Sequence, residues 1–190
     1  ERGLPPRFQI TPASLPTDLD AILEARGYEY FSPTVVQIAE PATILQNTTP
    51  LRQRPDFTVE LSEEFSEEWY ALYCEAEQAS PQACAVRSGI LQRIRPPVAF
   101  ATLKIDDNLA AIALGVVEKE WMGVFNVETH HDYRRRGAAS SLMRSLSIWA
   151  QMNKASNIYL QVVASNQPAR SMYENLGFST LHQYHYRLIR

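Results

Sequence analysis

The sequence has little cysteine and no excess of basic residues, and each shortage excludes a class of protein. Its two cysteines, Cys74 and Cys84, have no further Cys or His at ligand spacing around them, so they do not form a zinc-binding pattern. The formal net charge is −3, from 18 basic and 21 acidic residues, whereas a nucleic-acid-binding protein usually carries a basic excess. We therefore expect no nucleic-acid partner.

The chain also lacks a long apolar run and a recognisable leader. No stretch approaches the roughly 20 apolar residues that a membrane-spanning helix requires, so we expect no membrane partner. Residues 1–6 contain neither a Met nor the apolar core of a signal peptide; no targeting segment is visible, and the missing Met suggests a trimmed or truncated chain. We expect a cytoplasmic protein in which Cys74 and Cys84 are reduced thiols, although the sequence is compatible with a disulfide between them.

What the sequence does contain is sufficient for a packed core. Hydrophobic residues make up 45% of the 190 residues and charged residues 21%, a composition typical of folded domains. The length fits one domain, or one domain and a fragment of another. Strand-like segments come first and strand–helix–strand segments follow, which predicts a mixed α/β fold.

The most informative segment is residues 134–139, which read Arg-Arg-Arg-Gly-Ala-Ala. Residues 121–127 before it are aromatic and β-branched and predict a strand, while Leu142, Leu146 and Trp149 after it recur at helical spacing. A strand that turns through small residues into a helix directs free backbone N–H groups and the positive end of the helix dipole at one point. That point attracts a phosphate, and the three arginines add positive charge there.

This segment resembles the cofactor loop of the GNAT superfamily of acetyl-CoA-dependent N-acetyltransferases. The loop of that family reads Gln/Arg-x-x-Gly-x-Gly/Ala, and Arg134, Gly137 and Ala139 satisfy it. A second signature follows a predicted strand at residues 158–163, because residues 166–178 match the family's Asn-x-x-Ala-x-x-x-Tyr-x-x-x-Gly-Phe. Two motifs in the right order and spacing are more specific than either alone.

The resemblance implies direct transfer of an acetyl group from acetyl-CoA to an amine. It assigns the pyrophosphate of the cofactor to backbone N–H groups of residues 136–140. It assigns the pantetheine arm to exposed backbone groups of the preceding strand, where the N–H of Val127 or of a near neighbour would stabilise the oxyanion. The implied cofactor-binding residues are Val127, Glu128, Thr129, Arg134, Arg135, Arg136, Gly137, Ala138, Ala139, Ser140, Asn166 and Tyr173.

Two of these residues belong to the second signature and have further expected roles. Asn166 precedes Pro168 and is expected to cap the helix that begins there, and the resemblance adds a polar contact to the pantetheine or acetyl region. Tyr173 is the candidate catalytic general acid. A phenol of pKa about 10 stays protonated at neutral pH and can give its proton to the departing thiolate.

The catalytic general base is less well marked. Glu128, on the strand before the loop, is the first candidate, and Glu118 and Glu120 are alternatives, because a carboxylate can take the proton that an ammonium group must lose. The position that carries a glutamate in some relatives falls near Gly123. This chain therefore lacks that glutamate.

Two adjacent histidines, His130 and His131, follow the same strand. His131 is a further candidate for the base, since an imidazole also accepts a proton near neutral pH. The pair does not predict a metal site, because adjacent histidines on a turn are not expected to converge and no third ligand is evident. We therefore expect no metal.

Residues 57–190 carry the resemblance, which predicts a central mixed twisted sheet flanked by helices. Within this part, residues 57–61 alternate as a strand does, and Ser62 is expected to cap a helix that runs to Glu77. A hairpin is expected across residues 106–108.

Residues 1–56 do not fit the start of a complete domain of this family. Residues 7–40 show a strand, a helix, a Gly–aromatic pair and a strand, and a shift of 150 positions places residues 24–28 on residues 174–178. We interpret this pattern as an internal repeat and residues 7–40 as the closing half of a degenerate second GNAT-like lobe. An unrelated N-terminal β-α-β extension is the alternative, and residues 41–56 are read as a linker.

The acceptor is expected to be a small-molecule or peptide amine that the sequence does not identify. A catalytically silent acyl-CoA-binding or sensor domain on the same fold is the alternative function. An interaction module that uses the arginines against an acidic partner is a third hypothesis. Paired lobes and dimers are usual in the family, so a homodimer is compatible with the sequence.

Overall fold

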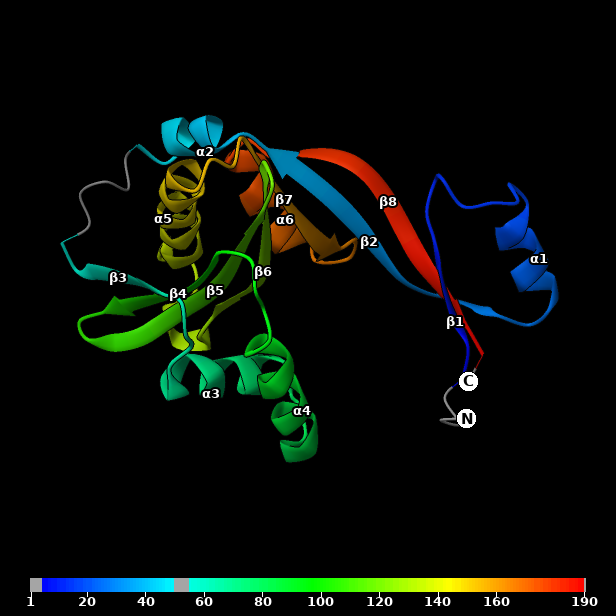
Figure 1. Cartoon of the computed structure of the whole chain (residues 1–190), viewed down its shortest axis with the longest axis horizontal. Helices are drawn as coiled ribbons and strands as arrows, with labels where there is room; N and C mark the ends of the chain where they lie inside the picture. Colours follow the sequence, from blue (N-terminus) through cyan, green and yellow to red (C-terminus); the bar gives the residue numbers. More distant parts are fainter. Residues whose placement is uncertain (1–4, 50–54, 190) are drawn as a thin grey trace. The chain divides into compact units, whose positions relative to one another are not determined.

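The computed structural model describes residues 5–49 and 55–189 and divides the chain into two compact units (Figure 1). The first unit comprises Glu1–Ile38 and Leu160–Arg190, and the second comprises Ala39–Tyr159. Over the described residues the chain forms eight strands and six α-helices. This content confirms the expected mixed α/β class.

The first unit is built on strands in the order β1-β8-β2-β7. β8 is antiparallel to both of its neighbours, and β2 and β8 run side by side over most of their length (Figure 1). The strand–helix–strand pattern predicted within residues 7–40 is therefore present. The elements of this unit are β1 (Arg7–Ile10), α1 (Leu19–Ala25), β2 (Glu29–Ala39), β7 (Asn157–Val163), α6 (Gln167–Asn175) and β8 (Ser179–Leu188).

Helices α1 and α6 end in the same way. Each is followed by a glycine in the left-handed region, Gly27 at φ 83° and Gly177 at φ 97°, a conformation that glycine adopts without steric cost. These two glycines lie 150 positions apart. The closing hydrogen bonds match at the same spacing: Tyr28 N donates to Leu23 O and Phe178 N donates to Tyr173 O, both at 3.0 Å.

The end pairs of β2 with β8 map onto one another under the same shift of 150 positions. Glu29 pairs with Leu188 at one end of the two strands, and Ile38 pairs with Ser179 at the other. Moving Glu29 forward and Leu188 back by 150 converts the first pair into the second. The ends of the two strands therefore pair at the spacing of the predicted repeat.

A charged cluster holds α1 against β8. Arg187 is only 5% exposed, and its Nε and Nη2 donate to the two carboxylate oxygens of Asp20 at 2.7 and 3.2 Å. His185 Nε2 lies 2.8 Å from the same carboxylate. Hydrogen bonds from Arg187 lower the pKa of Asp20 to about 2 against the opposing effect of burial, so the pair stays charged at neutral pH.

The second unit is an antiparallel sheet with the strand order β6-β5-β4-β3. The predicted hairpin between β4 and β5 is confirmed: Asp106 and Asp107 have φ of 48° and 64°, as a two-residue type I′ turn requires. No helix within the described ranges has the length and apolar character needed to cross a membrane. The elements are α2 (Pro41–Asn47), β3 (Phe57–Ser62), α3 (Glu67–Ala76), α4 (Pro81–Leu91), β4 (Val98–Ile105), β5 (Asn108–Glu118), β6 (Trp121–Thr129), a short 3₁₀ turn (His131–Tyr133) and α5 (Ala138–Met152).

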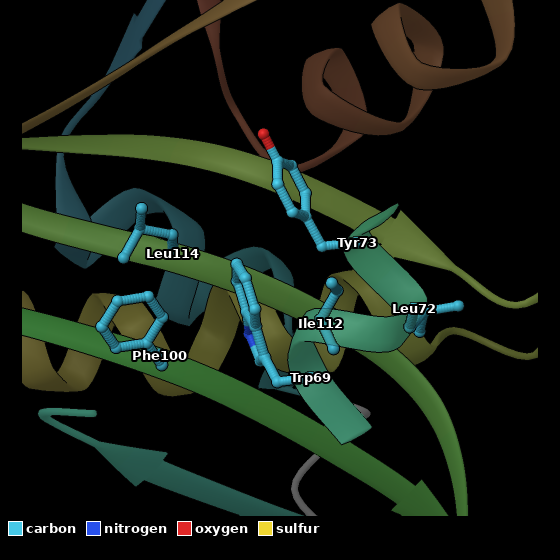
Figure 2. Packing of buried hydrophobic residues seen from close by; sticks show 6 residues of the cluster. All are labelled: Trp69, Leu72, Tyr73, Phe100, Ile112 and Leu114. Atoms are coloured by element: carbon cyan, nitrogen blue, oxygen red, sulfur yellow. The ribbon is translucent and has the colours of Figure 1, made fainter. Parts of the chain in front are cut away.

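Helices cover both faces of this sheet. A Cβ added to Gly115 would lie 3.0 Å from the Leu146 side chain, so α5 packs closely on that face. The opposite face of β5 packs against α3, where Trp69 is fully buried (Figure 2). The Trp69 Nε1–H lies within hydrogen-bond distance of Ala101 O (3.2 Å) and Ala113 O (3.3 Å), so the indole anchors α3 to two neighbouring strands.

The start of α3 differs from the prediction. The capping residue is Ser66, whose Oγ accepts a hydrogen bond from Trp69 N at 3.1 Å, and not Ser62. Ser62 is the last residue of β3 and pairs with Phe100. The sequence offers two serines before the acidic turn, and the sheet register decides between them because it keeps Ser62 extended.

A helix that the sequence pattern did not predict occupies the first part of residues 41–56. Helix α2 begins at Pro41, a residue suited to the first turn because it lacks an N–H. Its C-terminal end is held by Arg144 of α5, which donates to Leu45 O at 3.1 Å and to Thr48 Oγ1 at 3.2 Å. The later part of the segment includes residues 50–54, which lie outside the described residues.

The two cysteines are joined, which contradicts the expectation of reduced thiols. Cys74 near the end of α3 and Cys84 near the start of α4 form a disulfide, with their Cα atoms 6.1 Å apart. The turn between the helices brings these positions within the range that a disulfide spans. The Tyr70 hydroxyl donates to the Cys84 carbonyl and adds a second link between the helices.

Candidate active site

Strand β6 carries a β-bulge just before the loop. Ile112 of β5 pairs with Glu128 and Leu114 pairs with Phe125, so one residue of β5 faces both Asn126 and Val127. Asn126 has a φ of 51°, the left-handed geometry of a bulge whose first residue is usually glycine. The bulge interrupts the β5–β6 ladder at Val127, the residue predicted to present its N–H to the substrate.

The loop after β6 has the geometry of an anion-binding turn. Arg135 and Gly137 have φ of 65° and 86°, and Gly137 is the N-cap of α5 without a side-chain cap hydrogen bond. The first helical bond runs from Ser141 N to Gly137 O at 3.0 Å. In an α-helix the N–H groups that precede this bond, here those of Ala138, Ala139 and Ser140, have no partner within the helix. They point out of the helix N-terminus, where a phosphate is favoured.

The three arginines of the loop are exposed but differ in their contacts. Arg134 Nε donates to Thr129 O at 3.3 Å, so it ties the loop to the end of β6. The Arg136 guanidinium lies 5.3 Å from the centre of the Tyr133 ring, a cation–π distance. Arg135 carries the first positive φ and therefore shapes the turn with its backbone as well as adding charge.

Glu128 is a half-buried carboxyl next to the bulge. It pairs with Ile112, whose side chain belongs to the core beneath α3. Burial raises the pKa of Glu128, the charge of Glu77 raises it further, and Arg134 opposes both. A carboxyl with a raised pKa accepts a proton more readily than an exposed one, as a general base requires.

A groove of about 660 Å³ lies on the α4 side of the sheet, next to the bulge. Its walls are mostly apolar and aromatic, with Glu118, Lys119 and Asn126 as the polar residues. Pockets of this size and composition are typical of small-ligand sites. The lining residues are Leu91, Ile94, Leu114, Val116, Glu118, Lys119, Trp121, Gly123, Phe125, Asn126 and Tyr159.

Gly123 stands where some relatives carry a glutamate, and two aromatic side chains lie beside it. A Cβ at this position would lie 2.7 Å from the Phe125 ring and 2.8 Å from the Tyr159 hydroxyl. The space that an acidic side chain would need is therefore filled by two aromatic residues. Any general base of this chain has to come from another position.

The alternative bases occupy different surroundings. Glu118 lines the groove, and its charge, after burial, raises the pKa of Tyr159. Glu120 is exposed at the β5–β6 turn, where its carbonyl accepts from Ser156 N at 2.9 Å. His131 is exposed in the 3₁₀ turn. Of these three, only Glu118 lines the groove.

The histidine pair behaves differently from the expectation. One ligand atom each of Glu75, His130 and His131 lie within 4.8 Å of one another. Adjacent histidines therefore do converge, and the third ligand comes from α3, more than fifty positions earlier in the chain. Sequence spacing gave no signal for this contact, because it depends on how α3 packs against the end of β6.

Asn166 and Tyr173 belong to the first unit, whereas the bulge, the loop and the groove belong to the second. Asn166 Oδ1 accepts from Ala169 N at 3.2 Å, which confirms its predicted role as the cap of α6. Tyr173 is 6% exposed, and its ring makes an edge-to-face contact with Phe178 at 5.6 Å. The structure thus brings together the loop, the bulged strand and Glu128. It places Asn166 at the N-cap of α6 and Tyr173 within that helix.

Comparison with known proteins identifies this arrangement. Residues 30–187 match the family described as "Probable histone acetyltransferase Rv0428c C-terminal". The chain belongs to the GNAT superfamily of N-acetyltransferases. This acetyltransferase is 30% identical over 188 residues to the Uncharacterized N-acetyltransferase YobR of Bacillus subtilis (strain 168). The aligned residues cover 99% of this chain and 74% of that protein.

Two more distant relatives agree with this assignment. A ribosomal protein bS18-alanine N-acetyltransferase of Salmonella typhimurium is 34% identical over 77 residues, which cover 40% of this acetyltransferase and 52% of that enzyme. The solved structure of a GCN5-related N-acetyltransferase from Kribbella flavida has a TM-score of 0.68 at 17% identity and covers 96% of this chain and 67% of that one. The second likeness shows the fold alone.

Proposed function

We propose that this N-acetyltransferase transfers the acetyl group of acetyl-CoA directly to a primary amine. The observation that carries the proposal is the uncapped N-terminus of α5 behind Gly137, immediately after a bulged strand. The N–H groups of residues 136–140 would bind the pyrophosphate, and Val127, Glu128 and Thr129 would pair with the pantetheine arm. The Val127 N–H would stabilise the oxyanion, a contribution of about 3 kcal/mol for one well-placed donor.

In the proposed step, the uncharged amine nitrogen attacks the thioester carbonyl carbon. Glu128 takes the proton that the ammonium form loses. When the tetrahedral intermediate collapses, the C–S bond breaks and Tyr173 gives its phenolic proton to the thiolate. The nitrogen loses its remaining extra proton as the amide forms, and this proton restores the Tyr173 phenol. Asn166 would add a polar contact to the pantetheine beyond its capping role, and no metal takes part in this scheme.

The groove is the proposed site of the acceptor. Its apolar and aromatic walls favour an amine attached to an apolar or aromatic group, and Glu118 can attract the positive charge of such an acceptor before it loses its proton. Both a small molecule and the end of a peptide satisfy this description. The Salmonella relative is named for a ribosomal protein, which makes peptide amines a reasonable part of a search.

We also propose that residues 1–56 form a partial GNAT-like lobe with its linker and that residues 57–190 form the acetyltransferase domain. The matching ends of α1 and α6 and the corresponding end pairs of β2 with β8 support this division. A cytoplasmic location and a homodimer stay predictions.

The direct test is a screen of primary amines for thiol release from acetyl-CoA. We expect release with acceptors that carry an apolar or aromatic group next to the amine, and little release with small polar amines. The matched measurement is calorimetric titration of coenzyme A into the same protein. Binding without turnover on any amine would favour the silent sensor, and the absence of binding would favour an interaction module.

Replacing Glu128 with Gln is expected to remove the low-pH limb of the kcat profile and lower kcat about 100-fold. In the unmodified enzyme the rate should fall as the pH drops through the pKa of Glu128, because the base acts only when it is deprotonated. Burial raises that pKa above the ordinary glutamate value of 4.5, so the limb should lie above that value. The measurement is the pH dependence of kcat with an acceptor found in the screen.

Glu118→Gln is the matched control for this prediction. It removes a carboxylate that lines the groove, so it should raise the KM of the acceptor and leave the low-pH limb of kcat in place. If Glu118→Gln removes the limb and Glu128→Gln keeps it, the base is Glu118 and the assignment of Glu128 is wrong.

A further inference from the structure

A group of three metal-ligating side chains lies on the α3 side of the loop and has no part in the proposed transfer. Glu75 comes from the last turn of α3, and His130 and His131 follow β6. Their ligand atoms all lie within 4.8 Å of one another. The two imidazole rings are 4.3 Å apart at an angle of 33°, so both rings face the same side of the turn.

A fourth residue, Asp132, lies against the two rings. Asp132 Oδ1 lies 3.2 Å from His131 Nε2, and Asp132 Oδ2 lies 3.8 Å from His130 Nδ1. His131 Nε2 therefore faces the carboxylate, which leaves its Nδ1 for an ion. His130 Nδ1 accepts from the backbone N–H of Asp132 at 3.4 Å, so Asp132 contacts both rings. For His131 this is the arrangement of metal-binding histidines in proteins, where the second ring nitrogen usually donates to a carboxylate that fixes the ring.

The donor set selects the kind of ion. Two imidazole nitrogens and one carboxylate oxygen suit divalent transition metals such as Zn²⁺ and Co²⁺, whereas Ca²⁺ and Mg²⁺ prefer oxygen ligands alone. Metal–ligand distances of about 2.1 Å bring the ligand atoms to roughly 3.5 Å from one another in a tetrahedral site. Small rotations of the exposed Glu75 and His131 side chains supply this contraction from the present spacing.

We propose that Glu75, His130 and His131 form a binding site for one divalent transition-metal ion, with Asp132 as the residue that positions the two rings. The ion would join the end of α3 to the segment that leads into the loop, since Arg134 follows the 3₁₀ turn directly. A bound ion would therefore restrain the start of the cofactor loop at Arg134. The proposal does not depend on the acetyl transfer.

The test uses the full chain after removal of metal with a chelator. Zn²⁺ is titrated by calorimetry, and Co²⁺ is added separately to record the visible absorption bands that report its ligands. We expect one ion per chain. His130→Asn and Glu75→Gln should each weaken binding at least tenfold, and Asp132→Asn should weaken it about 10- to 100-fold, the usual effect of losing a carboxylate that orients a ligand.

His182→Asn is the matched control, because His182 lies on β8 of the first unit and has no part in the cluster. It should leave the affinity and the Co²⁺ bands unchanged. Thermal unfolding of each metal-free variant checks that the variant is folded. If His130→Asn does not fold, Glu75→Gln, which changes an exposed side chain, tests the site in its place. Failure to take up one ion per chain overturns the proposal. It is equally overturned by uptake that Glu75→Gln leaves unchanged, or by uptake that His182→Asn abolishes.

Discussion

Replacing Gly137 with valine should lower the affinity for coenzyme A at least 100-fold, equivalent to about 2.7 kcal/mol. Gly137 is the N-cap of α5 at a φ of 86°, where a β-branched residue is strained. The valine would change the backbone that aims the N–H groups of the first turn, and its side chain would stand where the phosphate has to approach. Calorimetric titration of coenzyme A into the variant measures the loss.

Gly27→Val is the matched control for this substitution. Gly27 has nearly the same φ, 83°, and a Cβ added there meets nothing within 4 Å. The two substitutions therefore introduce similar backbone strain, but Gly27 lies outside the cofactor loop. Both should lower the temperature of unfolding, and only Gly137→Val should lose the cofactor. If coenzyme A binds the two variants equally well, the pyrophosphate is held elsewhere and the assignment of the loop is wrong.

The strand, turn and helix around residues 134–139 could be predicted from the sequence because their determinants are local. An aromatic, β-branched strand, a turn of small residues and an amphipathic helix follow one another directly, and each is encoded by its own residues. The same reason explains the ends of α1 and α6, since a glycine after a helical pattern is enough to predict the left-handed stop at Gly27 and Gly177.

The features that the sequence did not predict depend on partners far away in the chain. The bulge at Asn126 arises from the register of β6 against β5, and only an asparagine within an apolar strand gave a signal for it, since Asn tolerates the left-handed region better than other residues. The choice of Ser66 over Ser62 as a cap follows from the pairing of β3 with β4.

The convergence of Glu75 with the histidine pair and the disulfide between Cys74 and Cys84 share one cause. Both depend on the placement of the end of α3, which the burial of Trp69 against two strands determines. Local pattern predicts that a helix forms there, but the residues it approaches are set by the packing of one indole in the core. Contacts between segments that are far apart in the chain are therefore the part of this site that the sequence alone does not predict.

Replacing Tyr173 with phenylalanine should lower kcat about 100-fold, the usual contribution of a positioned general acid. The affinity for coenzyme A should change little. The ring of Tyr173 is buried and packs on Phe178, and phenylalanine preserves this contact, so the variant removes the phenolic proton without opening a cavity. Steady-state rates of thiol release and calorimetric titration of coenzyme A, measured on the same preparation, separate the two effects.

Tyr184→Phe controls for the loss of a buried hydroxyl as such. Tyr184 is 8% exposed, and its hydroxyl donates to Gln161 Oε1 at 2.6 Å, so its removal should cost about 1 kcal/mol of stability and leave turnover unchanged. If Tyr173 is the general acid, only Tyr173→Phe slows the reaction. The loss of rate should be larger for acyl donors with a poor thiol leaving group than for donors with a good one, because a stable thiolate can leave without a proton. Equal turnover in the two variants would mean that water or another group protonates the thiolate and that Tyr173 serves to pack α6.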